Sequence, residues 1–517
     1  MTESSKFLSI YRKALYLGAL GLAEVYLLWS LLQFVIWKKN YIKYEKWAGL
    51  LLIAGTVLYL VLVAVAERRR RGAENGGPAG SVKEFLRKAM SREQIFLIGF
   101  LVWYAVVCAV RTALDGKSYF SANDNRLFYT ALSSLLFFPM AKIAAGIAAG
   151  ISAGTVAGST TGTAAGIVAG STGGTAAGST AESTAENKVK KTIDLMLCSA
   201  VAAYTPVCAW VLWNFYHGVF VNLPSGNVVK LYQGLSLMIG VHRNTTAAYS
   251  LILLSICVYM LVTIKSRIKY VFFIPAAVVH FFVIILSNSR TCYMVLLAMI
   301  IVPALVRGAG YLKRVKIKNK ALVVAGAVAA AVLVVAALYF LRSGIIASNA
   351  ETWREKLHNP DAMRVRKMVG LSGRINIWKA SVKLMFSSPD RFFFGVTPTM
   401  LPSVLWEIGK FPVKQPNCHN VILQVGTCFG VPMMLLYIWF TASVALRGLR
   451  VMRDGGRLFR GAWVIPVIFF GILMTDMLEV LTCANAFFNQ PVYFLLAGWI
   501  MAMDRALAAQ KGQNSAI

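Results

Sequence analysis

Residues 418–430 have the sequence CHNVILQVGTCFG, in which a histidine precedes an apolar segment. At helical spacing, His419, Leu423 and Gly426 fall on one stripe, which continues to Gly430. Glycines on such a stripe allow a second helix to approach closely within a membrane. The stretch therefore predicts a membrane helix that begins near Asn420 and holds an ionisable ring at the membrane boundary.

The composition extends this prediction to the whole chain. Of the 517 residues, 58% are hydrophobic and 14% are charged, whereas soluble domains have about 25% charged residues. Apolar runs of about 20 residues can cross a bilayer, and about twelve such runs occur here. They begin near Ala14, Trp47, Gln94, Leu127, Thr192, Thr246, Tyr270, Thr291, Ala321, Asn420, Gly461 and Phe487. We expect an all-α polytopic membrane protein, in which the first run is a retained span because it lacks a small-residue cleavage site.

The formal net charge of +32 is distributed along the chain in a way that indicates orientation. Basic residues concentrate in alternate connections between the expected spans. These connections are residues 68–92, 188–191, 265–269, 307–320 and 447–460. Because cytoplasmic loops carry an excess of Lys and Arg, both termini are predicted to be cytoplasmic. A nucleic-acid partner is not expected, since it would require a single basic face with interleaved aromatic residues.

The hydropathy pattern divides the chain into five parts. Residues 1–143 and 192–341 are predicted to hold the N-terminal and central membrane helices, and residues 419–517 the C-terminal helices with a short tail. Residues 144–191 are rich in Ala, Gly, Ser and Thr, which predicts a flexible cytoplasmic linker. Residues 342–418 are predicted to form the one large extracytoplasmic loop.

The large loop is too aromatic for a disordered segment, because it contains Trp353, Trp378 and Trp406. Residues 351–357 and 374–386 are expected to form short helices. The prolines from Pro389 to Pro416 then predict an irregular return towards His419.

Five charged residues are expected at the outer end of the membrane helices. They are Arg243, Arg290, Arg374, Asp476 and Glu479. Charge at membrane depth is costly and commonly marks a functional site. Alternatives remain: Arg290 can snorkel from a helix end, Arg243 and Arg374 can be ordinary loop cations, and Asp476 can pair with an arginine.

The eight cysteines do not suggest a disulfide framework, because most lie inside apolar runs. Cys418 and Cys483 both fall near outer span ends, so they are either free thiols or a pair. The chain has no Cys/His grouping with zinc-ligand spacing and no evident cluster of outer carboxylates, so we expect no metal and no cofactor.

The order and spacing of several motifs resemble the O-antigen ligase and O-antigen polymerase family of membrane glycosyltransferases. The motifs are Ser289-Arg290, Gly373-Arg374 with Trp378, the segment from Pro389 to Gly395, and His419-Asn420 followed by Gly430. The resemblance covers roughly residues 235–440. The chain departs from the family in two places. An arginine usual before Gly240 is absent, with Arg243 as its possible substitute, and Gly395-Val396-Thr397 replaces a Gly-x-Gly.

The resemblance implies a transferase in the cytoplasmic (inner) membrane that acts on its outer side. The donor would be a glycan on a polyprenyl pyrophosphate, the acceptor would carry a hydroxyl, and membrane lipid would surround both. His419 and Asn420 would be catalytic, while Arg290, Arg374 and Arg243 would bind the pyrophosphate, because guanidinium groups suit concentrated negative charge.

Asp476 and Trp378 are expected to support this site. Ligase and polymerase activities are not separated by these motifs, because they differ only in the acceptor. The alternative class is a transporter or a flippase for lipid-linked oligosaccharides. Such proteins commonly have two related halves, whereas no internal repeat is evident here and the charges lie at one face.

Overall fold

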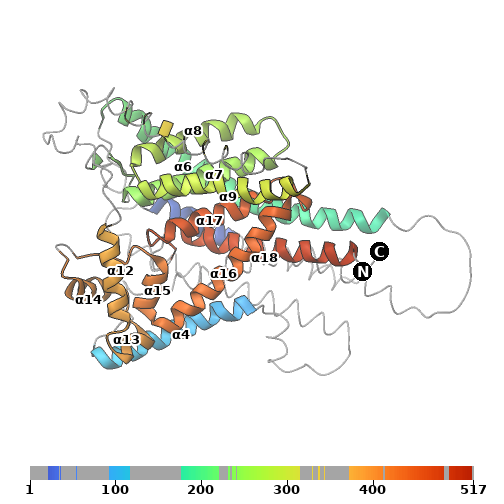
Figure 1. Ribbon diagram of the computed structural model, residues 1–517. Helices are drawn as coiled ribbons and strands as arrows, with labels where there is room; N and C mark the ends of the chain where they lie inside the picture. Colours follow the sequence, from blue (N-terminus) through green and yellow to red (C-terminus); the bar gives the residue numbers. More distant parts are fainter. Residues whose placement is uncertain are drawn as a thin grey trace, which may run out of the picture.

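The computed structural model describes residues 21–36, 92–116, 176–219, 231–314, 372–411, 414–482 and 488–514, with small gaps at 34, 233–235 and 240–241 and a few isolated residues elsewhere. Throughout these ranges the chain is almost entirely helical (Figure 1). The exception is a short antiparallel pair, β1 (Leu231–Tyr232) and β2 (Ser236–Leu237). The all-α prediction is thus correct for the described residues apart from this one small ribbon.

Six described helices are long and apolar enough to cross a membrane. The helices are α6 (Ala176–Tyr216), α7 (Arg243–Thr263), α8 (Lys269–Ser287), α9 (Arg290–Arg314), α16 (Val431–Asp454) and α18 (Asn489–Asn514). Their apolar windows are Ile193–Tyr216, Arg243–Thr263, Lys269–Ser287, Arg290–Gly308, Val431–Arg457 and Asn489–Gln510. The protein is therefore a multi-pass membrane protein. The total of about twelve spans and their orientation stay predictions, because several expected spans lie outside the described residues.

A large buried core joins these helices. It draws residues from α6, α7, α8, α16 and α18, and from the shorter apolar helix α17 (Val464–Asp476). Tyr259 and Phe469 are fully buried there, each with its ring against an aromatic residue of α18. Since lipid surrounds the bundle, such packing relies on close van der Waals contact rather than on exclusion of water.

A second unit gathers at one end of the membrane helices (Figure 1). It consists of α12 (Ser372–Met385), α13 (Pro389–Phe394), α14 (Leu401–Gly409) and α15 (Val421–Phe429), packed with α4 (Arg92–Asp115). The shared core of this unit includes Val107 of α4, Leu384 of α12, Leu405 of α14 and Val425 of α15. The large loop is thus folded against the membrane domain in its described part.

The prediction of an irregular return through the prolines is correct only in part, because residues 395–400 and 414–420 have no regular structure whereas two of the prolines begin helices. Pro389 occupies the first turn of α13, and Pro402 occupies the first turn of α14. Proline suits this position because its fixed φ is already helical and its missing N–H would have no partner there. The expected helix at 374–386 corresponds to α12, and the one at 351–357 lies outside the described residues.

The predicted span from Asn420 is also corrected, because the chain breaks at Gly430 into two helices. Gly430 has φ 88°, a value that L side chains rarely adopt. A Cβ there would overlap the carbonyl oxygen of Phe393. The membrane-crossing helix is α16, which follows the glycine. His419 therefore precedes the short helix α15 and does not share a helical stripe with Gly430.

The low-complexity linker ends earlier than the predicted boundary at residue 191. Helix α6 begins at Ala176 and continues into the span at Ile193, so the last part of the Ala-rich segment is helical. Alanine has the highest helix propensity of the common residues, and the adjacent span supplies a helical template. Residues 144–175 lie outside the described part of the chain.

Candidate active site

His419 sits in a tight turn just before α15, and its backbone is left-handed, with φ 49°. The backbone N–H of His419 donates to Oδ1 of Asn417 at 2.9 Å, which stabilises the turn. Asn420 then caps α15, because its Oδ1 accepts the N–H of Leu423 at 3.0 Å. The turn and the cap together set the direction in which the imidazole leaves the backbone.

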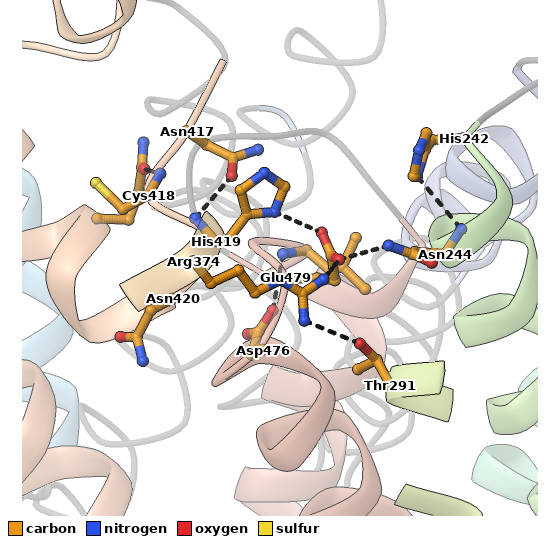
Figure 2. A network of polar contacts seen from close by, with 12 residues as sticks. His242, Asn244, Thr291, Arg374, Asn417, Cys418, His419, Asn420, Asp476 and Glu479 are labelled. Atoms are coloured by element: carbon orange, nitrogen blue, oxygen red, sulfur yellow. Dashed lines mark hydrogen bonds and ion pairs between the residues drawn. The ribbon is translucent and has the colours of Figure 1, made fainter. Parts of the chain in front are cut away.

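The imidazole meets Glu479, a buried carboxylate in the turn that follows α17 (Figure 2). Nδ1 of His419 lies 3.0 Å from Oε2 of Glu479. The other carboxylate oxygen, Oε1, accepts from Nη2 of Arg374 and from the side-chain amide of Asn244. One carboxylate therefore joins residues from three separate parts of the chain.

Four helix N-termini converge on this carboxylate. Asn244 is the second residue of α7, Arg374 the third of α12, and His419 lies two residues before α15. Helix α9 reaches the cluster through Thr291, whose hydroxyl oxygen accepts a hydrogen bond from Nη1 of Arg374 at 3.2 Å. Because helix N-termini carry partial positive charge and unsatisfied N–H groups, their convergence favours an anion.

All three candidate arginines lie at these helix starts. Arg243 is the first residue of α7 and adjoins Asn244, while Arg290 is the first residue of α9 and adjoins Thr291. Both side chains are half-buried. The structure thus brings Arg243, Arg290 and Arg374 to one region together with His419.

Glu479 stays ionised within this cluster. Burial by itself raises the pKa of a carboxyl group, but the hydrogen bond from His419, the charge of Arg374 and the charges that His419 and His242 carry when protonated outweigh it. The pKa of Glu479 is consequently below its ordinary value. A buried carboxylate that lost these partners would be strongly destabilising, by about 3–5 kcal/mol in comparable cases.

Asn420 and Asp476 hold the turn that carries Glu479. Nδ2 of Asn420 donates to the carbonyl oxygen of Met477 at 3.0 Å, which ties the start of α15 to this turn. Oδ1 of Asp476 accepts the backbone N–H groups of Leu481 at 2.7 Å and Thr482 at 3.1 Å. Its other oxygen accepts the hydroxyl of Thr482. Both side chains therefore bind main-chain groups of the turn, and the contacts of Asp476 are with this turn rather than with an arginine.

Trp378 lies one helical turn after Arg374 on α12, as the spacing predicts. Its ring is partly buried. Within the described residues, its Nε1 is buried without a hydrogen-bond partner. This indole N–H is therefore an unsatisfied buried donor one helical turn from Arg374.

Sequence reasoning missed several members of the cluster. Glu479 is among the predicted outer charges, but the predicted supporting acid is Asp476. Asn244 and Thr291 each follow a candidate arginine directly, which was the one available signal for them. His242 has no such signal in the sequence, and the structure places it at the start of α7 beside Asn244 (Figure 2).

Two side chains of α4 bind α13 and α15 within the loop unit. Arg111, which is buried, donates to Asp390 of α13 at 2.9 Å and to the carbonyl oxygen of Gly395. Nε1 of Trp103 donates to the carbonyl oxygen of Phe429 at 2.9 Å. These contacts hold α13 and the end of α15 in place. Helix α15 is the helix that follows His419.

No group of three or more His, Cys, Asp or Glu side chains that could hold a metal ion occurs among the described residues. The fold and the cluster define a multi-pass helical membrane protein with a His–Glu–Arg site at one end of its helices.

Residues 275–438 match the family model described as O-antigen ligase. Over these residues the match agrees with the resemblance to O-antigen ligases that the sequence motifs predicted. The match includes Arg290, Arg374 and His419, whereas Asn244 and Glu479 lie outside it. No curated protein matches the chain.

Proposed function

We propose that this protein is a glycosyltransferase of the cytoplasmic membrane that moves a glycan from a polyprenyl-pyrophosphate carrier to an acceptor hydroxyl at the outer face, in surface polysaccharide biosynthesis. The proposal rests on one observation. Glu479 binds both His419 and Arg374 at the place where four helices begin. Such an arrangement combines a proton acceptor with a region that favours anions.

His419 is the proposed general base. If Nδ1–H donates to Glu479, Nε2 carries the lone pair and can accept the proton of the acceptor hydroxyl. The acceptor oxygen then bonds to the anomeric carbon while the bond from that carbon to the phosphate oxygen breaks. Polyprenyl pyrophosphate leaves with the electron pair, and the imidazolium that forms is stabilised by Glu479 before it releases its proton to water.

The arginines are the proposed partners of the pyrophosphate. Arg374 uses one Nη for Glu479 and the other for Thr291, so its plane is fixed before a substrate binds. A fixed guanidinium loses little freedom when further N–H groups bind phosphate oxygens. Arg290 and Arg243, at neighbouring helix starts, add positive charge where the leaving group gains negative charge.

The placement of basic residues supports an outer site. The end of α16 that is remote from His419 carries Arg447, Arg450 and Arg453. Likewise, α8 begins at Lys269, after Lys265 and Arg267, and ends at Ser287, three residues before Arg290. Since Lys and Arg in the loops between spans mark the cytoplasmic side, the His419 cluster belongs to the opposite face.

The loop unit has an apolar surface that suits a lipid-linked donor. Ile375, Phe386, Phe393 and Trp406 are all exposed large hydrophobic residues of α12–α14 or the turns beside them. Aromatic residues favour the membrane interface, where an apolar ring and a polar edge are both accommodated. A polyprenyl chain could thus remain in lipid while its pyrophosphate reaches the helix starts.

The test separates the roles of the base and the arginine. In nanodiscs, His419→Ala should lose about 10²- to 10⁴-fold in single-turnover transfer rate while it still binds a polyprenyl diphosphate sugar. Arg374→Ala should lose donor affinity as well as rate, because the arginine contacts the pyrophosphate before and during transfer. Arg374→Lys should restore little, since a lysine offers no bidentate contact.

His217→Ala is the matched control, because His217 is an exposed histidine at the end of α6 whose Nδ1 contacts the carbonyl oxygen of Trp213. It should transfer at the parent rate. Full activity of folded His419→Ala would remove the catalytic assignment, and failure of the parent to transfer a glycan while it moves lipid-linked glycan across the bilayer would favour a flippase.

A further inference from the structure

His242 lies next to the proposed site but outside the chemistry described above. It is the N-cap residue of α7, and its Nδ1 accepts the backbone N–H of Asn244 at 3.4 Å. The side chain of that same Asn244 donates to Glu479. One short segment therefore connects the His242 ring to the carboxylate that binds His419 (Figure 2).

The ring of His242 remains available to a ligand. The residue is exposed, and its Nε2 makes no hydrogen bond to any of the described residues. Because Nδ1 accepts the cap hydrogen bond, a neutral ring in this geometry carries its proton on Nε2. His242 thus presents one N–H donor at the rim of the cluster.

The charged groups around His242 come from four parts of the chain. Arg243 is its neighbour on α7, Arg374 comes from α12, His419 from the turn before α15, and Glu479 from the turn after α17. Although part of the residue is exposed, desolvation by the surrounding protein lowers the pKa of His242, Glu479 opposes this effect, and Arg243, His419 and Arg374 lower the pKa further. The net result is a pKa below the ordinary value, so the ring is neutral at pH 7.

We propose that His242 binds the diphosphate of the donor through Nε2 and takes up a proton from solvent when that anion arrives. This inference rests on the proposed function. A bound diphosphate brings negative charge close to the ring and offsets the nearby cations, which favours the imidazolium form. The charged ring then donates a stronger, charge-assisted hydrogen bond to a phosphate oxygen. Donor binding is consequently coupled to proton uptake at His242.

The coupling is measurable with the full chain in nanodiscs and polyprenyl diphospho-N-acetylglucosamine as the probe. This diphosphate diester has no ionisation of its own near neutral pH, so any proton taken up belongs to the protein. Calorimetric titrations in buffers of different ionisation enthalpy report the number of protons bound with each donor. The same titrations between pH 5.5 and 7.5 report the donor affinity.

For the parent, we expect a fraction of one proton to be taken up at pH 7 and the affinity to increase about 3- to 30-fold from pH 7.5 to 5.5, the range for a single site. His242→Asn should abolish both effects, because asparagine caps a helix well but does not titrate. His242→Ala removes the cap and the donor together, so an equal loss of coupling in both variants assigns the effect to the ring rather than to the cap.

His217→Asn, which changes a histidine outside the cluster, should keep the parent coupling. Equal proton uptake by the parent and by His242→Asn would overturn the inference and assign the proton to another group. If instead the parent binds no diphosphate sugar at any pH, the proposed function itself fails, which is a different outcome from a lost pH dependence.

Discussion

Nδ1 of His419 lies 3.0 Å from Oε2 of Glu479, although the two residues are 60 positions apart in the chain. The same carboxylate binds Arg374 of α12 and Asn244 of α7. Glu479 thus sets the orientation of both the proposed base and the proposed pyrophosphate ligand. Glu479 is therefore a positioning residue, which affects the reaction through His419 and Arg374.

Glu479→Gln is expected to reduce transfer by about 10²- to 10⁴-fold. Glutamine keeps the size of the side chain, but it no longer stabilises an imidazolium or balances Arg374. Glu479→Asp should restore part of the rate, because the charge returns with a shorter reach. The single-turnover rate in nanodiscs measures both variants, and a parent-like rate for Glu479→Gln would rule out the orienting role.

The contribution of Glu479 to stability should depend on pH in one direction. Because its pKa is lowered on folding, the contribution is present above the ordinary value of 4.5 and is lost as the pH falls through the lower folded value. The difference in melting temperature between the parent and Glu479→Gln should therefore be constant from about pH 5.5 to 8 and shrink below pH 4.5. A difference that disappears between pH 8 and 6 would contradict this assignment.

Gly430→Ala is expected to destabilise the protein by at least about 2 kcal/mol. Alanine is strained at the positive φ of this position, and its Cβ also meets a neighbouring backbone atom. The added Cβ would overlap the carbonyl oxygen of Phe393 at φ 88°. Gly456→Ala is the matched control, because nothing lies within 4 Å of a Cβ at that glycine. Thermal unfolding in detergent compares the two, and an equal melting temperature would show that the break between α15 and α16 is not required.

Cys418 should behave as an unreactive free thiol. It is fully buried, its Sγ lies 3.3 Å from Oγ1 of Thr427, and burial raises the pKa of its thiol to about 11. The folded protein should thus resist maleimide labelling at Cys418 at pH 7.5 and react once denatured. Cys483 lies outside the described residues, and we expect it to be free as well. Detection of a Cys418–Cys483 linkage by non-reducing mass spectrometry would refute the prediction.

Transfer is expected to continue in excess chelator. The reason is the proposed chemistry, in which arginines and helix N-termini, rather than a divalent cation, stabilise the departing pyrophosphate. Purified protein with a polyprenyl diphosphate glycan should turn over equally with and without EDTA. Complete loss of activity that magnesium or manganese restores would disprove metal independence.

The sequence by itself determined the membrane class and the resemblance to O-antigen ligases, and it named several residues of the candidate site. Apolar runs of about 20 residues correctly located α6, α7, α8, α9 and α18, because the thickness of a bilayer imposes a minimum length on a spanning helix. The sequence names His419, Arg374 and Arg290 as candidates because charge near a membrane boundary is costly and therefore stands out locally. These signals are contained in short segments.

Only the tertiary structure decided how those segments meet. The choice of Glu479 over Asp476 depends on which way each side chain leaves one short turn, and apolar periodicity does not encode that direction. The break at Gly430 likewise depends on the backbone of Phe393, 37 positions earlier, so a local pattern predicted one continuous helix. Contacts between distant segments arise from packing, and packing is a property of the whole fold rather than of any single stretch of sequence.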